Sequence, residues 1–298
     1  MQELCRRTYE LLRTHPALWL PYLVAELLAI FLWQLWGMAR EGIFKWFTTG
    51  HSVLGGNLSA PRDNYAALDR ASIVGLPLGL ATVLVVVCLF VAALVATAAM
   101  VNSIGREQKL DASEILGGVA QRWRAILLFA LRFLIVFGVI GAGTTAVFFF
   151  ALRMTHREDL HTWYVSNSGM MLVWVGCAAW LVMPAVIRLL RGDAAGMLST
   201  QSRNRGTVIA ILVSEAGVAL GAIAQKLEAP MVLDAHWEFK ALGVLNSILA
   251  NAPDVVLFIA LALLAADYSR ESENNKRSKI HELLQALMPL HFHPDKES

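Results

Sequence analysis

The fold of this chain follows from a stretch whose centre reads Leu80-Ala-Thr-Val-Leu-Val-Val-Val-Cys-Leu-Phe-Val-Ala-Ala-Leu94. The whole stretch, from Ala71 to Gly105, contains no Asp, Glu, Lys or Arg. A helix crosses the hydrocarbon core of a bilayer in about 20 residues, so this stretch is long enough to span it. Because backbone polar groups must be paired inside lipid, the span is expected to be helical. The sequence therefore predicts an integral membrane protein.

The composition agrees with this interpretation. Hydrophobic residues make up 57% of the 298 residues and charged residues only 16%, whereas soluble domains carry about 25% charged residues. The chain has room for several spans but not for a large soluble domain as well. Its three cysteines, Cys5, Cys88 and Cys177, form neither a Cys-x-x-Cys metal motif nor a pair positioned for a disulfide.

The N-terminus resembles a signal peptide only in part. Arg6, Arg7 and Arg13 precede an apolar run at residues 17–39, but this run of 23 residues is longer than the apolar region of a signal peptide. We therefore expect an uncleaved first span.

Similar apolar segments recur along the chain, and they predict an all-α, polytopic membrane domain covering residues 1–266. The six transmembrane helices are expected at about residues 17–39, 72–101, 125–152, 169–190, 207–225 and 242–266. Amphipathic surface helices are expected before the first, third and fifth spans. Asp111 and Glu114 have the spacing of a capping box at the second of these helices, with Asp in place of the usual Ser or Thr. A charged cytoplasmic tail, residues 267–298, follows the last span.

The distribution of basic residues predicts the orientation. Sixteen Lys and Arg residues lie in the segments on the side of the two termini, and eight lie in the segments on the other side. By the positive-inside rule both termini face the cytoplasm. The expected location is the cytoplasmic (inner) membrane of a bacterium, with membrane lipids as partners.

The chain also contains a weak internal repeat. At an offset of 82 residues Asp111 aligns with Asp193, and at an offset of 108 residues Ala17 aligns with Ala125. Each unit would hold a basic surface helix, an elbow and two spans. The alternative is that any helix end facing the cytoplasm collects Arg and Trp.

This layout resembles poorly characterised six-span bacterial membrane proteins, including the membrane domain attached to some glycerophosphoryl diester phosphodiesterases. The resemblance lies in Leu12-Arg-Thr-His-Pro-Ala-Leu-Trp-Leu-Pro21 at the start of the first span and in the elbows at Gln121–Arg124 and Arg203–Gly206. It implies an architecture over residues 1–266. It implies no activity, because no phosphodiesterase domain follows.

Four charged side chains fall inside the predicted spans: Glu26, Arg132, Glu215 and Asp254. A charge at the centre of a bilayer costs about 2.5–3.5 kcal/mol on insertion scales, so each needs an explanation. In the repeat alignment Glu26, Arg132 and Glu215 fall within three positions of one another, which would allow Arg132 to lie between two carboxylates. These residues form either a polar site for an ion, a proton or an anionic headgroup, or a structural set in which Arg132 reaches the headgroups and the acids pair or stay protonated.

Asp254 follows Asn251-Ala-Pro253, and proline interrupts helical hydrogen bonding. A broken helix at membrane depth often lines a binding cavity. Asp254 could instead cap a helix that begins there. Both interpretations remain open from the sequence.

Basic residues at the elbows are candidate contacts for anionic lipid, at about 1 kcal/mol for each charge near the surface. They are Arg122, Arg124, Arg203 and Arg205. Gly75-x-x-x-Gly79 allows the close approach of another helix.

No catalytic signature is present. All eight His residues lie outside the predicted spans, and the sequence has no His-Glu-x-x-His helix, no Gly-x-Ser-x-Gly elbow and no Gly-rich phosphate loop. We therefore predict no enzymatic activity, cofactor, metal or nucleic-acid partner. The function expected is that of a membrane-embedded scaffold or lipid-interacting module. The alternative is a small transporter or channel that uses the four intramembrane charges.

Overall fold

The structure is a computed structural model that describes residues 2–52, 61–155, 160–191, 200–228, 244, 247–248 and 251–267. All regular secondary structure in these residues is helical, which confirms the all-α class. The helices are α1 (Gln2–Thr14), η1 (Pro16–Trp19), α2 (Leu20–Ser52), α3 (Pro61–Ile104), α4 (Ala112–Gln121), α5 (Trp123–Thr155), α6 (Leu160–Arg191) and α7 (Thr200–Glu228). Residues 253–267 form a further helix, called here the C-terminal helix.

Three helical stretches among the described residues are long and apolar enough to cross a membrane. They are Pro16–Ile43, Ile73–Ile104 and Trp123–Gly143, with mean hydropathies of 1.7, 3.0 and 2.5. A membrane protein is therefore confirmed. The other predicted spans overlap α6, α7 and the C-terminal helix, and the total of six spans stays a prediction.

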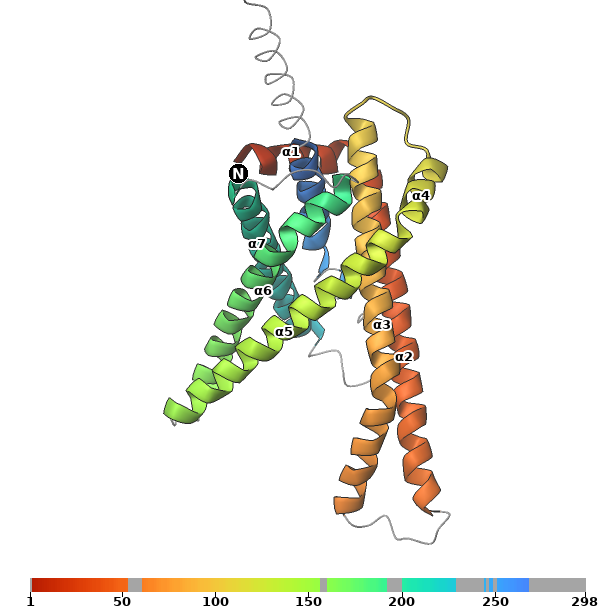
Figure 1. Cartoon of the computed structure of the whole chain (residues 1–298), viewed down its shortest axis with the longest axis vertical. Coiled ribbons are helices and arrows are strands. Elements are labelled where there is room, and N and C mark those ends of the chain that lie inside the picture. The colour runs from red at the N-terminus through yellow and green to blue at the C-terminus, as the bar shows by residue number, and fades with distance from the viewer. Residues whose placement is uncertain are drawn as a thin grey trace, which may run out of the picture.

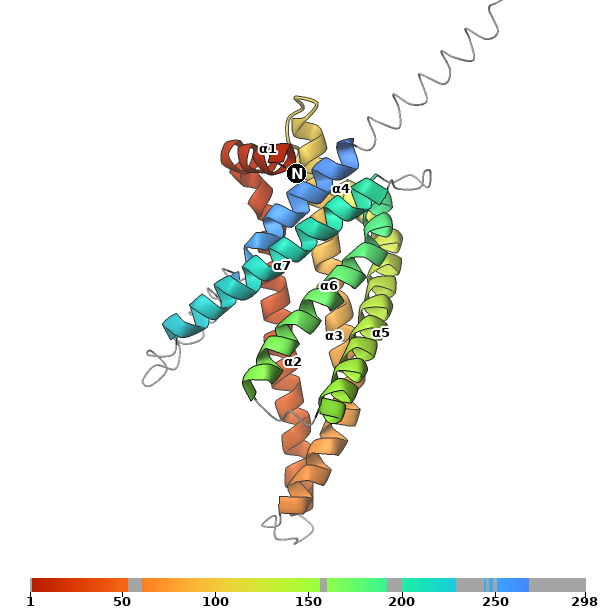
Figure 2. The ribbon, with the colours of Figure 1, turned by 90° about the vertical axis from the view of Figure 1, so that its left-hand side faces the viewer.

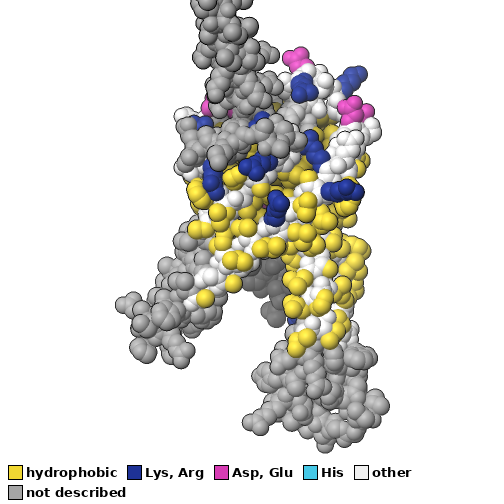
Figure 3. Space-filling model, viewed as in Figure 1, with side chains coloured by type: hydrophobic (Ala, Val, Ile, Leu, Met, Phe, Trp, Pro, Cys, Tyr) yellow, Lys and Arg dark blue, Asp and Glu magenta, His cyan; other side chains and the backbone are white. Residues whose placement is uncertain are grey.

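The outer surface of these helices is apolar. Large hydrophobic side chains such as Phe31, Leu80, Ile135 and Val139 are exposed, and yellow side chains form a band in the space-filling view (Figure 3). Exposure of this kind would be unfavourable in water. In a bilayer it provides the surface that contacts lipid tails.

The long helices α2, α3, α5, α6 and α7 pack side by side in pairs, and α1 lies across one end of them (Figure 1). α2 packs along α3 as a long hairpin, α5 packs on α6, and α6 packs on α7. Figure 1 shows α5 and α6 leaning away from the α2–α3 hairpin, while α1 lies across one end of the molecule. We call this end, which also holds the end of α3 and the end of α6, the α1 end.

The C-terminal helix forms the centre of the packed region. Val255 and the continuous run Phe258–Ala265 are buried, and Figure 2 shows this helix beside α7 and directed toward the α1 end. A helix that is apolar on all sides is suited to such a position, because neighbouring helices cover every face. Neighbouring helices therefore cover this helix over residues 258–265.

Trp36 occupies the surface that Gly75 and Gly79 leave free. A Cβ atom at Gly75 would lie 3.0 Å from Cη2 of Trp36, and one at Gly79 would lie 3.1 Å from Cζ2 of the same ring. The motif thus gives room to an indole ring from α2. Another helix does approach these glycines closely, as predicted, and it does so through the Trp36 side chain.

The elbow between α4 and α5 also agrees with the sequence. Asp111 is the N-cap of α4, and its carboxylate accepts hydrogen bonds from the Ser113 backbone N–H and hydroxyl, both at 2.8 Å. These bonds hold the pKa of Asp111 below its usual value, with the Ser113 hydroxyl as the first cause. Arg122 then separates α4 from α5, with φ −97° and ψ 8°.

Several helix boundaries differ from the prediction. The elbow expected at Arg203–Gly206 is absent, because α7 runs without interruption from Thr200. The helices extend beyond the predicted spans, because α2 continues to Ser52, α3 begins at Pro61 and α6 begins at Leu160. Helical hydrogen bonding continues past the apolar segment because most polar residues are compatible with helix. Asp193, residues 53–60 and most of the predicted tail lie outside the described residues.

Candidate functional site

A pocket of about 810 Å³ lies at the α1 end. Its walls come from α1, the end of α3, the elbow at Arg122, the end of α6 and the C-terminal helix. Four arginines and one glutamate line it: Arg7, Arg106, Arg122, Arg191 and Glu10. Its volume is in the range of small-molecule sites. Most of the Lys and Arg side chains visible in Figure 3 gather at this end, beside the apolar band.

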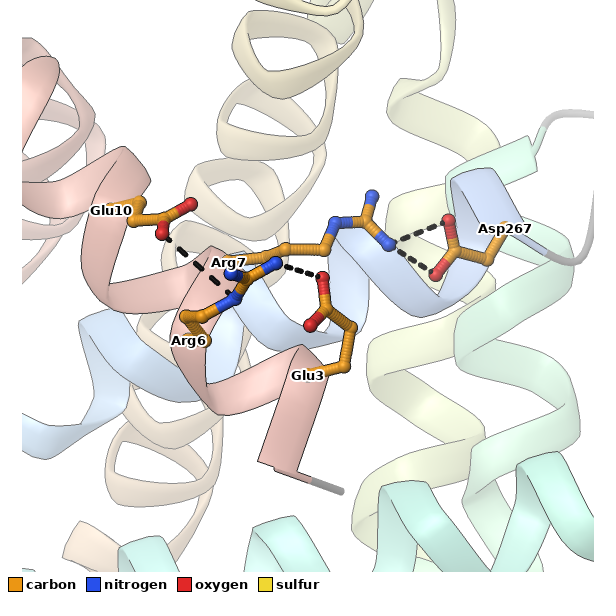
Figure 4. Close-up of polar contacts among 5 residues, drawn as sticks. All are labelled: Glu3, Arg6, Arg7, Glu10 and Asp267. Carbon is orange, nitrogen blue, oxygen red and sulfur yellow. Dashed lines mark hydrogen bonds and ion pairs between the residues drawn. The ribbon is translucent and has the colours of Figure 1, made fainter.

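Arg7 is held in the wall of the pocket by an ion pair. Its Nη1 atom lies 2.8 Å and 3.1 Å from the two carboxylate oxygens of Asp267, at the end of the C-terminal helix (Figure 4). Arg6 points elsewhere and pairs along α1 with Glu3 at 2.9 Å and Glu10 at 3.9 Å. The hydrogen bond from Arg6 holds the pKa of Glu3 below its usual value. Arg7 therefore links α1 to the C-terminal helix, whereas Arg6 stabilises α1 alone.

Arg122 is also fixed by the fold. Its Nη1 atom donates to the carbonyls of Leu189 and Leu190, at 3.2 Å and 3.3 Å. These carbonyls belong to the last turn of α6, where acceptors have no partner within the helix. Arg106 lies two residues beyond the end of α3 and is exposed. Its guanidinium makes no ion pair or hydrogen bond with the part of the chain that the structure describes.

Part of the pocket lining is apolar. Leu11, Ala98, Val101, Ala262 and Leu263 contribute to it. A site lined by both arginines and apolar side chains has the chemistry to receive a molecule with an anionic group and a hydrocarbon portion. A phospholipid at a membrane surface has this character.

Glu26, the first predicted intramembrane charge, is buried inside the bundle with 2% of its surface exposed. One carboxylate oxygen, Oε1, accepts hydrogen bonds from the Ser247 hydroxyl at 2.7 Å and from the Asn251 amide at 3.0 Å. Both donors precede the C-terminal helix. Glu26 therefore links α2 to Ser247 and Asn251, which lie in the last predicted span just before Pro253.

Asp254 lies beside Glu26. A turn at Ala252 precedes the C-terminal helix, and the Val255 N–H donates to the Ala252 carbonyl at 3.2 Å. Asp254 is in the first turn of this helix and interacts electrostatically with Glu26. Residues 244, 247–248 and 251, before this turn, are also helical, so both interpretations of Asp254 stay predictions. Residues 245–246 and 249–250, where the rest of the predicted span begins, lie outside the described residues.

Arg132 and Glu215 do not join this pair. Both side chains are exposed on the outer surface, on α5 and α7, and neither side chain makes an ion pair or hydrogen bond with another described residue. The arrangement with Arg132 between two carboxylates is not observed. The repeat alignment compares positions along the chain, but the face on which a residue lies also depends on the rotation of its helix.

The four elbow arginines take different positions. Arg122 lines the pocket. Arg124 is exposed and lies over the Trp123 ring at 5.3 Å from its centroid. Arg203 is partly buried against α6, where its Nε atom donates to the Trp180 carbonyl at 2.6 Å. Arg205 is exposed.

Sequence reasoning missed Arg7, Arg106 and Arg191 as members of one pocket, and it missed Tyr22 near Glu26. The three arginines belong to separate helix ends that only the packing brings together. Tyr22 carried a signal, because it lies one helical turn before Glu26 and therefore on the same face.

Comparison of the chain with protein-family models, with curated proteins and with solved structures finds no match. The resemblance to the membrane domain of glycerophosphoryl diester phosphodiesterases thus stays a prediction. Within the described residues no group of three or more His, Cys, Asp or Glu could hold a metal ion.

Proposed function

We propose that this chain is a non-enzymatic, multi-pass membrane protein that binds the headgroup of an anionic phospholipid at its α1 end. The observation that carries the proposal is the pocket lined by Arg7, Arg106, Arg122 and Arg191 together with apolar side chains. In this proposal the α1 end faces the cytoplasm and the chain crosses a bacterial inner membrane six times. The excess of Lys and Arg at that end supports this orientation.

Charge supports an anionic ligand. The pocket holds four guanidinium groups and one carboxylate, Glu10. Arginine presents several N–H donors in a planar fork that matches a phosphate group. Arg7 is engaged by Asp267 and Arg122 by the end of α6, so the exposed Arg106 is the first residue assigned to the phosphate. Arg191 lines the same pocket and adds a positive charge on the side of α6.

Position supports a lipid as the source of that phosphate. The pocket lies at the end of the apolar helix α3 and directly before the start of α5, at the level of the surface helix α1 (Figure 1). A phospholipid there could place its phosphate against the arginines and the start of its acyl chains over Leu11 and Val101. α1 is itself amphipathic, with Leu4 and Thr8 buried and most of its charged side chains exposed, as expected of a helix at a membrane surface.

Native mass spectrometry of the purified full chain tests this proposal. The protein is equilibrated with phosphatidylglycerol or with phosphatidylcholine, and bound lipids are counted. We expect retention of phosphatidylglycerol in preference to phosphatidylcholine. At about 1 kcal/mol for each arginine, Arg106→Gln and Arg191→Gln should each weaken retention about fivefold.

Arg124→Gln is the matched control, because Arg124 is exposed outside the pocket. It should leave the lipid count unchanged. Equal retention of the two lipids, or an equal loss in the control, would contradict the proposal. The same measurement with inorganic phosphate in place of the lipid distinguishes two kinds of site. Binding of phosphate alone would indicate a site for the free ion, and no binding would indicate a headgroup site that also needs the acyl chains.

A further inference from the structure

Glu26 and Asp254 face each other across two antiparallel helices. Tyr22 and Glu26 are one turn apart on α2, and Asp254 and Phe258 are one turn apart on the C-terminal helix. The Tyr22 and Phe258 rings meet edge to face, with centroids 6.3 Å apart. Because the helices run in opposite directions, this contact places Glu26 opposite Asp254.

The pair lies deep within the bundle. Asp267 pairs with Arg7 of the surface helix α1, and Asp254 is thirteen residues earlier, about 20 Å along a helix. Glu26 is ten residues beyond Pro16, about 15 Å by the same rise. Both carboxylates are therefore well inside a hydrocarbon core about 30 Å thick.

No basic side chain of the described residues forms an ion pair with Glu26 or Asp254. Two carboxylates at this depth repel each other, and each loses hydration on burial. Ser247 and Asn251 both donate to Oε1 of Glu26. A cation between the two carboxylates would offset their repulsion and their lost hydration.

Tyr22 supplies a second and independent observation. Its side chain is fully buried, and its hydroxyl has no hydrogen-bond partner among the residues the structure describes. The hydroxyl lies close enough to Glu26 and Asp254 to interact electrostatically with both carboxylates. A buried polar group without a partner is costly, and a ligand between the carboxylates would provide the missing partner.

We propose that Glu26, Asp254 and Tyr22 bind one dehydrated monovalent metal cation in the interior of the bundle. The oxygen atoms at the site are the two carboxylates, the phenol, and the Ser247 hydroxyl. Hard cations prefer such oxygen ligands. A helix break at membrane depth is also where membrane proteins place coupling ions. The site lies apart from the arginine pocket, so its occupancy does not depend on lipid binding there.

Thermal unfolding of the full chain in detergent tests this inference. The unfolding temperature is measured in choline chloride and after replacement of choline by Na⁺, K⁺ or Li⁺ at constant ionic strength. A cation that binds only the folded state raises the unfolding temperature with a saturable dependence on concentration. We expect such a rise for at least one alkali cation and its loss in Glu26→Gln and Asp254→Asn.

Glu215→Gln is the matched control, because Glu215 is an exposed carboxylate on α7; it should keep the full response. Tyr22→Phe keeps the buried ring and removes only the hydroxyl, so it should weaken the apparent affinity for the cation if the acid variants fail to fold. An identical response to choline and to all three alkali cations would overturn the inference. A response that persists in the Tyr22, Glu26 and Asp254 variants would overturn it as well. Stabilisation by low pH alone, with no effect of alkali cations, would mean that the pair shares a proton, and it would also overturn the inference.

Discussion

The Nε atom of Arg203 in α7 donates a hydrogen bond to the backbone carbonyl of Trp180 in α6, at 2.6 Å. Pro184 lies inside α6, four residues after Trp180. Proline has no N–H, so this carbonyl has lost its partner within the helix. The guanidinium also lies over the Trp180 ring, 3.4 Å from its centroid. Arg203 therefore joins α7 to α6 at the point where proline interrupts the hydrogen bonding of α6.

Replacing Arg203 by Ala should lower the free energy of unfolding by about 1–3 kcal/mol, because the Trp180 carbonyl is left unpaired. In a Pro184→Ala background the cost should shrink, because the backbone N–H gained by that substitution can then donate to the same carbonyl. Denaturant unfolding in micelles measures both values. Arg205→Ala, at an exposed position of α7, is the control and should have little effect. An equal cost of Arg203→Ala with and without Pro184 would show that the hydrogen bond has no such role.

Trp36 packed against Gly75 and Gly79 yields a second prediction. Gly79→Val would place a branched side chain against the indole ring, since a Cβ atom alone would lie 3.1 Å from it. We expect a loss of roughly 1–3 kcal/mol in stability. In combination with Trp36→Ala the two losses should be less than additive. Gly138→Val is the control on α5, where nothing lies within 4 Å of an added Cβ. Strictly additive stability losses for Trp36→Ala and Gly79→Val would contradict a contact between the two residues.

The ion pair between Arg7 and Asp267 should hold α1 against the C-terminal helix. Both side chains are partly exposed, so the pair is expected to contribute up to about 1 kcal/mol. Asp267→Arg should increase amide hydrogen exchange in α1, and adding Arg7→Asp should restore protection. Arg6→Asp in place of Arg7→Asp is the control, because Arg6 forms its ion pairs with Glu3 and Glu10 of the same helix. If Arg6→Asp restored the protection of α1 as well, the overall charge of α1 would account for the effect, and a specific pair between Arg7 and Asp267 would not.

The cap of α4 should respond to pH. The folded-state pKa of Asp111 is lowered by hydrogen bonds from Ser113, so its contribution to stability is present above the unfolded-state pKa and is lost as pH falls through the folded-state pKa. Amide exchange of Ser113 and Glu114, followed from neutral to acidic pH, should show that loss. Asp111→Asn keeps an oxygen acceptor and should remove this pH dependence. A wild-type pH profile unchanged in Asp111→Asn would assign the effect to another group.

Much of the fold was predictable because its signals are local. The charge-free stretch at Ala71–Gly105 and the cap at Asp111 depend on nearby residues, and the structure confirms both a helix over that stretch and the cap. Residues 40–52 and 160–168 are helical but lie outside the spans that hydropathy predicted. Hydropathy marks where lipid ends, whereas a helix ends where its hydrogen bonding stops.

The site was predictable only in part, because it depends on the rotation of each helix about its axis. In soluble proteins an apolar stripe reveals that rotation, but lipid is as apolar as the core, so the buried and lipid-facing sides of α5 and α7 look alike. The sequence could therefore identify Glu26 and Arg132 as unusual without showing that the first is buried and the second exposed. Arg7, Arg106 and Arg191 could not be assigned to one pocket for another reason, because they come from helix ends far apart in the chain.

Photo-crosslinking tests the central claim most directly. A phosphatidylglycerol analogue with a photoreactive group beside its phosphate is added to the full chain in bilayers, and mass spectrometry locates the modified residues. The account predicts modification at the pocket, in residues 98–106, 190–191 and 262–266, with competition by unlabelled phosphatidylglycerol. Modification spread evenly over other residues at the α1 end, with none in the pocket, would contradict it.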